Sequence, residues 1–395
     1  MANEKGPMRS LLHALASTLA LSSLALIAGA CGKGIFSSSS SSSSSGGSTA
    51  TPRSVYVSNF TDGKISSLNR SSSGALTSPI TLSGGSDSGP VGLAVTPGNT
   101  MLYAANAKDD LIYEFPLTSN GNLGSPSSIA TGSNPQQPVL VPSGQYAYSI
   151  NAGGSISEYT VDSTSGALAN NTTSSTKSGL IAPISGVASN SYLYVTDQQT
   201  GNGVVLTFTI KGDGTLANGP SSTPSLGTPP GASAPNQIML LTTTSPSHTW
   251  VFVSDAKAGR ISLFKASSNG LTFINSYLTA ASTPNLADAG LLAVKKGSNI
   301  FIYCADQTSD TVSVFLFNPS LPSLTLTSAS AVGALNTPTG LAHAGDFLYV
   351  TNNANGTVTR FDINTANGAL TNPVNYDTEN PANALSGPQS ILITG

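Results

Sequence analysis

The stretch Val55-Tyr56-Val57-Ser58-Asn59 carries an aromatic residue that is followed, three positions later, by an asparagine. The same spacing, with Asp replacing Asn in some copies, occurs seven times. The copies run from Tyr56 to Asn59, Tyr103 to Asn106, Tyr148 to Asn151, Tyr194 to Asp197, Phe252 to Asp255, Tyr303 to Asp306 and Tyr349 to Asn352. They begin 47, 45, 46, 58, 51 and 46 residues apart. A period of about 40 to 50 residues with four short strands is typical of a β-propeller.

The second repeat shows how one period divides into strands. Apolar segments separated by turn residues predict strands at 91–95, 102–105, 111–117 and around 127–130. Each repeat therefore has the content of one four-stranded propeller blade.

A second motif marks the turn between the third and fourth strands. It consists of a polar residue, Gly, any residue and Leu, and it occurs at 73–76, 120–123, 165–168, 213–216 and 367–370. A polar residue followed by Gly accepts the positive φ that tight hairpin turns require. The fifth repeat keeps only Asn269-Gly270-Leu271, and the sixth has Leu321-Pro322-Ser323-Leu324 instead.

The two ends of the repeat region complement each other. The first repeat lacks an innermost strand, whereas the chain finishes with an additional one at 387–393. We therefore predict an all-β, seven-bladed β-propeller at 53–395, closed by pairing of the N- and C-terminal strands in one blade. Closure of the ring removes the open sheet edge that would otherwise favour aggregation.

Composition limits the classes of ligand. Only 8% of the residues are charged, the formal net charge is −3, and clusters of Lys and Arg are absent apart from Lys295-Lys296. This argues against nucleic acid as a partner. Common metal-binding, phosphate-binding and nucleophile motifs are also missing, so we expect no metal and no cofactor.

The N-terminus has the features of a targeting segment. Lys5 and Arg9 precede an apolar run that ends in Ala28-Gly29-Ala30-Cys31, which resembles a bacterial lipoprotein signal. We predict a signal peptide at 1–30 and lipidation of Cys31, which would anchor the chain to the cell envelope, with the outer membrane favoured. Ala28 stands where such signals usually have Leu, and an ordinary cleaved signal or an uncleaved anchor remains an alternative.

A Ser- and Gly-rich segment follows the predicted lipidation site. Residues 31–52 include nine consecutive serines at 37–45 and are expected to form a flexible tether. The long fourth interval contains a Pro-, Gly- and Ser-rich insertion at 221–233, which we interpret as a disordered insertion in preference to a functional lid. Cys304 lies within a predicted strand and is expected to be a small buried side chain.

The motifs Val55-Tyr56-Val57-Ser58-Asn59 and Leu348-Tyr349-Val350-Thr351-Asn352, together with the Gly-Ala-Leu turns, resemble those of the lactonase-like seven-bladed propellers. This group includes 6-phosphogluconolactonase and many proteins with Tyr-Val-Thr-Asn repeats. The resemblance covers 55–395 and implies the propeller architecture. The motif residues also have structural interpretations: the Asn or Asp is expected to cap a turn and the aromatic residue to pack within the sheet.

The resemblance also implies where an active site would lie. Lactonases of the family use His, Arg and Glu at the mouth of the central channel, but the corresponding positions in this chain are Gln136, Gln137, Asn236, Gln237 and Asp255. Gln and Asn hydrogen-bond sugars and lactones, yet neither titrates near neutral pH and neither acts as a general base. His343 is the one His close to a predicted innermost strand, and a turn or surface role is favoured for it.

Two functions therefore remain open. The first is a non-catalytic, membrane-tethered scaffold that binds an envelope protein, a peptide or a glycan, because the scaffold is intact and the catalytic positions are substituted. The alternative is a lactone hydrolase of the cell envelope, which family resemblance alone supports. We expect a cluster of titratable groups at one end of the channel if the alternative holds.

Overall fold

The computed structural model describes residues 53–85, 89–171, 176–199, 203–217, 221–222, 226, 233–268, 270–279, 288–331, 334–379 and 381–394. The predicted signal peptide at 1–30 and the tether at 31–52, including Cys31, lie outside these residues, and so does most of the insertion at 221–233. All the regular elements of the described part are β-strands, which form seven sheets.

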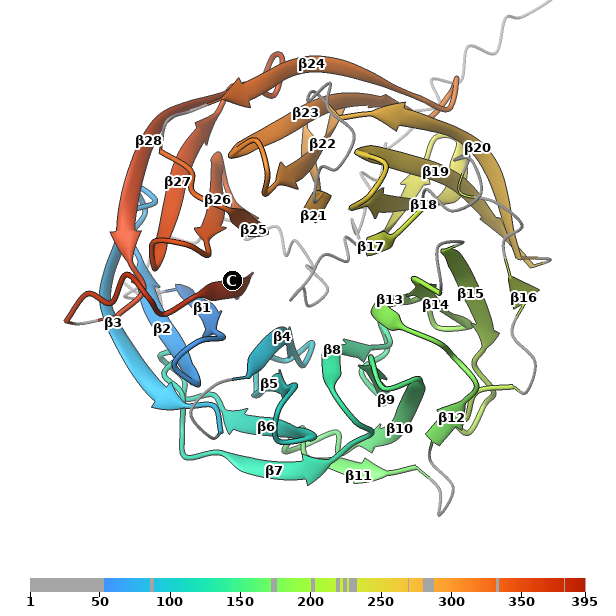
Figure 1. The fold of residues 1–395 in the computed structure, drawn as a ribbon, viewed down its shortest axis with the longest axis vertical. Coiled ribbons are helices and arrows are strands. Elements are labelled where there is room, and N and C mark those ends of the chain that lie inside the picture. Colours follow the sequence, from blue (N-terminus) through green and yellow to red (C-terminus); the bar gives the residue numbers. More distant parts are fainter. Residues whose placement is uncertain are drawn as a thin grey trace, which may run out of the picture.

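The sheets are arranged in a ring around a central channel (Figure 1), and the strands of each sheet follow one another from the channel outward. Blade 1 contains β29 (Pro388–Ile393), β1 (Arg53–Asn59), β2 (Lys64–Arg70) and β3 (Leu76–Ser83). Blade 2 contains β4 (Pro90–Val95), β5 (Met101–Asn106), β6 (Leu111–Pro116) and β7 (Ser127–Ala130). Blade 3 contains β8 (Pro135–Leu140), β9 (Tyr146–Asn151) and β10 (Ser155–Val161), and both β11 (Leu168–Asn170) and β12 (Thr176–Ser178) pair with β10.

The other four blades follow the same order. Blade 4 contains β13 (Pro183–Ala188), β14 (Tyr192–Asp197), β15 (Val204–Thr209) and β16 (Ser221–Ser222). Blade 5 contains β17 (Pro235–Thr244), β18 (Ser247–Asp255), β19 (Arg260–Ser267) and β20 (Gly270–Leu278). Blade 6 contains β21 (Asp288–Lys296), β22 (Asn299–Asp306), β23 (Thr311–Asn318) and β24 (Ser323–Ala331). Blade 7 contains β25 (Pro338–Ala344), β26 (Phe347–Asn352), β27 (Thr357–Ile363) and β28 (Leu370–Asp377).

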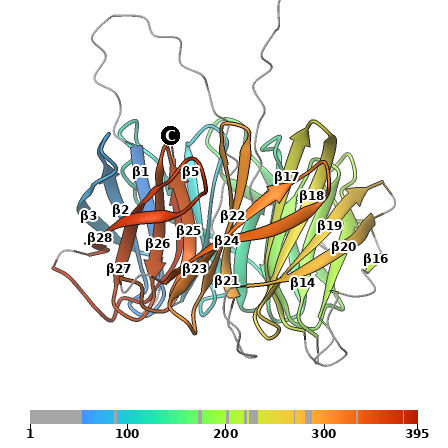
Figure 2. The same ribbon diagram turned by 90° about the horizontal axis from the view of Figure 1, so that it is seen from above.

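The predicted fold class is confirmed. β29 pairs antiparallel with β1, with Val55 opposite Ile393 and Val57 opposite Ile391, so the two ends of the repeat region complete one blade. In side view the innermost strands cross the thickness of the disc, and the outer strands tilt away from them (Figure 2).

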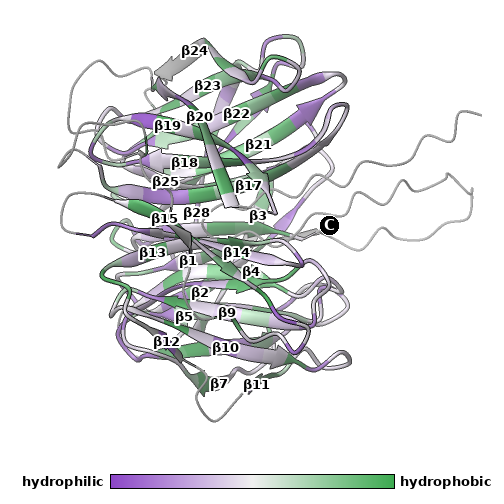
Figure 3. Ribbon diagram, turned by 90° about the vertical axis from the view of Figure 1, so that its right-hand side faces the viewer, coloured by the Kyte–Doolittle hydropathy of each residue, from purple (hydrophilic) through white to green (hydrophobic). Residues whose placement is uncertain are grey.

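The hydrophobic core is divided among the spaces between neighbouring blades. Between blades 5 and 6, for example, Trp250 and Phe252 each make an edge-to-face contact with Phe317, with ring centroids 5.6 and 5.1 Å apart. Cys304 is fully buried in the same cluster, as expected. Figure 3 shows the resulting alternation of hydrophobic and hydrophilic residues along the strands. Each blade buries its faces against two neighbours, so no blade has a complete core alone.

The tyrosine that recurs on the second strands forms a hydrogen bond that the sequence pattern did not reveal. In five blades its hydroxyl donates to the carbonyl oxygen of the turn glycine in the next blade. The pairs are Tyr56 with Gly121, Tyr103 with Gly166, Tyr148 with Gly214, Tyr303 with Gly368, and Tyr349 with Gly74. We call this contact the tyrosine–glycine latch. It joins blade 1 to blade 2, blade 2 to blade 3, blade 3 to blade 4, blade 6 to blade 7, and blade 7 to blade 1.

Two features of the glycine explain why the turn motif requires it. Gly214 has a φ of +81°, and a Cβ built there would lie 2.1 Å from the ring of Tyr146. Gly74 has a φ of +79°, and its Cβ would lie 2.6 Å from the ring of Phe347. Positive φ and close approach of a neighbouring aromatic ring both exclude a side chain. The backbone of the third-to-fourth turn therefore packs directly against an aromatic ring of the preceding blade.

The junction between blades 5 and 6 departs from the sequence pattern at both positions of the latch. Blade 5 has Phe252 at the tyrosine position, which lacks a hydroxyl, and the turn of blade 6 has Pro322 and Ser323 in place of the glycine motif. Both partners of the latch are thus absent at one junction, where the aromatic cluster around Phe317 fills the interface instead.

We predict that Tyr148→Phe lowers the free energy of unfolding by about 1 to 3 kcal/mol, because it leaves the carbonyl of Gly214 without its donor in a buried site. Tyr376→Phe is the matched control on an outer strand and should change stability by less than about 0.5 kcal/mol. The measurement is chemical unfolding followed by intrinsic fluorescence. Equal stability of the two variants would show that the latch does not hold the blades together.

Candidate functional site

The innermost strands begin at one end of the channel, and in six blades their first residue is proline. Proline is tolerated at the first position of a strand because its missing N–H is not needed there. The residue that follows faces the channel in all seven blades. These residues, which line a cavity of about 120 Å³ together with Gln237 and Gln307, are Val91, Gln136, Ile184, Asn236, Ala289, Thr339 and Gln389. We call this end of the channel the mouth.

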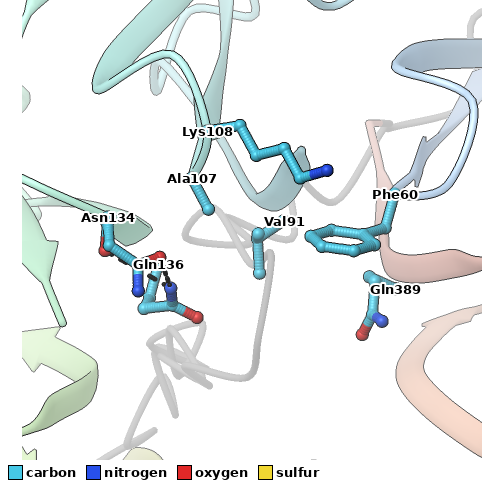
Figure 4. A pocket seen from close by; sticks show the side chains of 7 residues that line it. All are labelled: Phe60, Val91, Ala107, Lys108, Asn134, Gln136 and Gln389. Carbon is cyan, nitrogen blue, oxygen red and sulfur yellow. Dashed lines mark hydrogen bonds between the residues drawn. The ribbon is translucent and has the colours of Figure 1, made fainter. Parts of the chain in front are cut away.

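A larger cavity of about 520 Å³ adjoins this ring. Its lining, drawn in Figure 4, consists of Phe60, Val91, Ala107, Lys108, Asn134, Gln136 and Gln389. Val91, Gln136 and Gln389 line both cavities, so the larger one opens onto the mouth at blades 1, 2 and 3. The described lining thus combines amide groups, one ammonium group and one aromatic ring.

The loop that carries Lys108 is held by the Asn of its repeat. Asn106 is fully buried, and its Oδ1 accepts hydrogen bonds from the backbone N–H groups of Lys108 and Asp109 at 3.0 and 3.1 Å. Lys108 therefore projects from a capped turn directly after β5. In Figure 4 its side chain extends towards Phe60 along one side of the cavity.

The opposite side of the cavity is formed by Asn134 and Gln136 (Figure 4). The Nε2 group of Gln136 donates to Oδ1 of Asn134 at 2.6 Å. Asn134 has a φ of +57°, and its backbone N–H donates to Asp110 Oδ1 at 2.6 Å. These bonds fix the direction in which the Gln136 amide faces the cavity.

Two of the predicted site residues, Gln136 and Asn236, lie at the mouth. Gln137 is buried, and its Oε1 accepts from Ser185 Oγ at 2.8 Å and from the Gly186 N–H at 3.0 Å, so it joins blades 3 and 4. Gln237 is also buried. Its Oε1 accepts from the Leu291 N–H at 3.3 Å, although it borders the smaller cavity as well.

Asp255 and His343 lie apart from the cavity linings. Oδ1 of the buried Asp255 accepts from three backbone N–H groups, those of Ala234, Lys257 and Ala258, at 2.9 to 3.1 Å. It caps the turn, as expected for the motif. His343 pairs with Leu348 at the end of β25 opposite to Pro338, so the strand carries it away from the mouth.

Sequence reasoning missed Phe60, Lys108 and Gln389. Gln389 had a usable signal, because it follows Pro388 as Gln136 follows Pro135 and Asn236 follows Pro235. Lys108 and Phe60 lie in the loop directly after the Asn of their repeats, at positions two and one residues beyond it. Nothing in the spacing showed which of the seven such loops would border a cavity.

The described carboxyl groups whose pKa is raised lie outside the cavity linings, and two of them lie between blades. Burial raises the pKa of Glu114, whose Oε1 accepts from the Leu168 N–H of the next blade at 2.6 Å. Burial likewise raises the pKa of Glu158, which contacts Leu216 of the next blade at 3.3 Å and Lys177 Nζ at 4.0 Å. Both groups therefore serve the packing of neighbouring blades.

A third carboxyl group with a raised pKa, that of Glu379, lies where the ring closes. Burial, and next its hydrogen bond with Asp62, raise the pKa of Glu379. Lys64 Nζ lies 3.0 Å from Asp62 and 3.2 Å from Glu379, and it ties the β1–β2 loop to the segment that precedes β29.

The described residues contain no group of three or more His, Cys, Asp or Glu side chains arranged to hold a metal ion. The same part of the chain has no helix long and apolar enough to cross a membrane.

Comparison with known proteins agrees with this architecture. Residues 107–380 match the family described as "Lactonase, 7-bladed beta-propeller", which is more than half of the chain. The chain therefore belongs to this lactonase propeller family. No curated protein matches its sequence.

Two solved structures illustrate the likeness of fold. A protein of Bacteroides fragilis, named provisionally as a 6-phosphogluconolactonase, superposes with a TM-score of 0.72 at 16% identity, covering 89% of this chain and 100% of its own. The periplasmic gluconolactonase PpgL of Pseudomonas aeruginosa gives a TM-score of 0.72 at 16% identity, covering 87% of this chain and 99% of its own. At this identity the likeness establishes the fold.

The raised pKa of Glu114 has a definite consequence for stability. The folded state binds this proton more tightly than the unfolded chain, so stability is greatest below the unfolded pKa and falls as pH rises through the folded pKa. Glu114→Gln keeps an acceptor for the Leu168 N–H and removes the buried charge. We expect the variant to be more stable than the wild type at pH 8, with a smaller difference at pH 4.

Thermal unfolding at the two pH values checks this prediction. Glu158→Gln is the matched control, because it also removes the contact with Lys177 and should gain less. A Glu114→Gln variant that is less stable than the wild type at pH 8 would contradict the assignment of burial as the dominant cause.

Proposed function

We propose that the protein is a lactone hydrolase whose substrate binds in the cavity at the mouth of the channel. The observation that carries this proposal is the combination of one ammonium group, several amides and one aromatic ring in a cavity of about 520 Å³. Amides bind the hydroxyl groups of a sugar-like ring from either direction, because each has donor and acceptor atoms. Phe60 offers an apolar surface to the ring face. Family membership and the names of the similar structures support the same substrate class.

The chemistry requires stabilisation of negative charge. When water attacks the lactone carbonyl, its oxygen becomes negatively charged; collapse of the intermediate then breaks the ring C–O bond and yields a hydroxy acid. The ammonium group of Lys108 and the amide N–H group of Gln389 are suited to stabilise that oxygen, whereas the Nε2 group of Gln136 donates to Asn134. The lining contains no carboxylate or imidazole among the described residues, so we assign proton removal from water to solvent. The rate should then rise with pH as hydroxide increases.

The lack of a carboxylate or imidazole in the described lining also supports a second candidate function. A lining without a general base fits a scaffold that binds a sugar-like lactone, a glycan or a peptide without converting it. In this case the mouth would retain affinity for the ligand, and Lys108 would contribute to binding alone.

A panel of lactones, including a phosphorylated sugar lactone, separates the two candidates. We expect the full-length chain to hydrolyse at least one of them faster than the measured spontaneous rate, and Lys108→Met to lower kcat/KM by about 10- to 100-fold. Lys257→Met is the matched control, because Lys257 occupies the same position in the blade 5 loop and is not part of either cavity lining.

Absence of turnover in a folded sample, with calorimetric binding of gluconate or an oligosaccharide that Lys108→Met weakens, would favour the scaffold. Equal effects of Lys108→Met and Lys257→Met on turnover would contradict the proposed site.

We further propose that the chain is extracytoplasmic and attached to the bacterial envelope through lipid on Cys31, with 31–52 as a tether. The support is the targeting pattern at 1–30 and, by analogy, a structural relative named as periplasmic. Cys31→Ser should move the protein from the membrane fraction to the soluble fraction of cells. Unchanged membrane association, or an untouched Cys31 in the mass spectrum of the mature chain, would refute the lipid anchor.

A further inference from the structure

The outermost strands of the blades differ in how they are protected. An exposed strand edge presents unpaired N–H and C=O groups, and proteins commonly shorten such strands or place proline or charge in them. In blades 2, 3 and 4 the outer strands have only two to four residues. In blades 1 and 7 the outer strands are eight residues long and contain Pro79 and Pro373.

Blades 5 and 6 lack each of these protections. Their outer strands, β20 and β24, are nine residues long, with the sequences GLTFINSYL and SLTLTSASA. Neither contains proline or a charged residue. Among the described strands, none pairs with the outer edge of either one. This sector of the rim (Figure 1, β20 and β24) therefore offers open backbone groups.

The exposed side chains of this sector include several large apolar groups. Leu278 is 60% exposed and Phe273 is 37% exposed, both on β20. The hydroxyl of Tyr277 donates to the Pro322 carbonyl at 3.4 Å, which places the end of β20 against the turn that carries Leu321, 73% exposed. Apolar contacts thus accompany the open edge.

We propose that β20 is a self-association edge, at which a second copy of this chain pairs antiparallel with the same strand. A two-fold axis perpendicular to the sheet brings a strand against itself in the antiparallel sense, which is the geometry of an isologous interface. Because β20 is uncharged, self-pairing places no like charges opposite one another. Prolines and short strands elsewhere on the rim confine such pairing to this sector. This proposal is independent of the activity at the mouth.

Cysteine cross-linking of the purified full-length chain tests the proposal. Thr272→Cys and Asn275→Cys place thiols at two exposed positions on β20, and Val374→Cys places one on the proline-containing edge of β28 as the matched control. Under mild oxidation we expect at least one β20 variant to form a disulfide-linked dimer at more than ten times the rate of Val374→Cys.

A second substitution distinguishes specific pairing from random collision. Adding Phe273→Lys to the cross-linking variant places like charges at the interface and should reduce the dimer to the level of the control. Cross-linking of both β20 variants at the control rate, or a dimer that persists in the presence of Phe273→Lys, would overturn the proposal.

Discussion

The hydrogen bond from a buried tyrosine to the carbonyl of a turn glycine in the next blade is the contact on which the rest of the structure depends. A propeller closes only if each blade meets its neighbour at nearly the same angle, and small errors would accumulate around seven junctions. The latch fixes two points of each junction where it occurs, the second strand of one blade and the third-to-fourth turn of the next. Burial raises the pKa of Tyr103, Tyr148 and Tyr303 well above the usual range, because removal from solvent disfavours the charged phenolate.

The same repeat separates structural and functional positions along each blade. The aromatic residue, the turn glycine and the buried Asn or Asp all have partners in the scaffold, and their identities vary little between repeats. The second residue of each innermost strand faces the channel, and no single scaffold contact is shared by this residue in all the blades. It is therefore free to differ, and it is Val91, Gln136, Asn236 or Thr339 in different blades. The mouth therefore has different side chains on its different sides and lacks seven-fold symmetry. Lys108 of blade 2 adds a cationic group to one side of the mouth, and Phe60 of blade 1 adds an apolar ring beside it.

Much of the fold could be predicted from the sequence because its signals are local and repeated. The period located the blades, the Gly motif located the hairpins, and the strands predicted for the second repeat differ from the observed ones by no more than a residue at either end. The site was less predictable because it depends on where loops from different blades meet. Gln136 and Asn236 were placed at the mouth by their positions, but Gln137 and Gln237, one residue further along, point into the blade interfaces as the strand alternation requires. The latch was missed for a related reason. Both of its partners were recognised, but in four of the five pairs they lie about 65 residues apart and meet only when consecutive blades pack, and Tyr349 meets Gly74 only when the ring closes.

The central claim is that the channel mouth beside Lys108 binds a lactone or the hydroxy acid formed from it. A crystal structure of the protein with gluconate at saturating concentration tests this most directly. The account predicts that the ligand occupies the cavity between Phe60, Gln136 and Gln389, with an oxygen within hydrogen-bonding distance of the Lys108 ammonium group. A ligand bound on another surface, or a mouth that stays filled by water alone at that concentration, would contradict it.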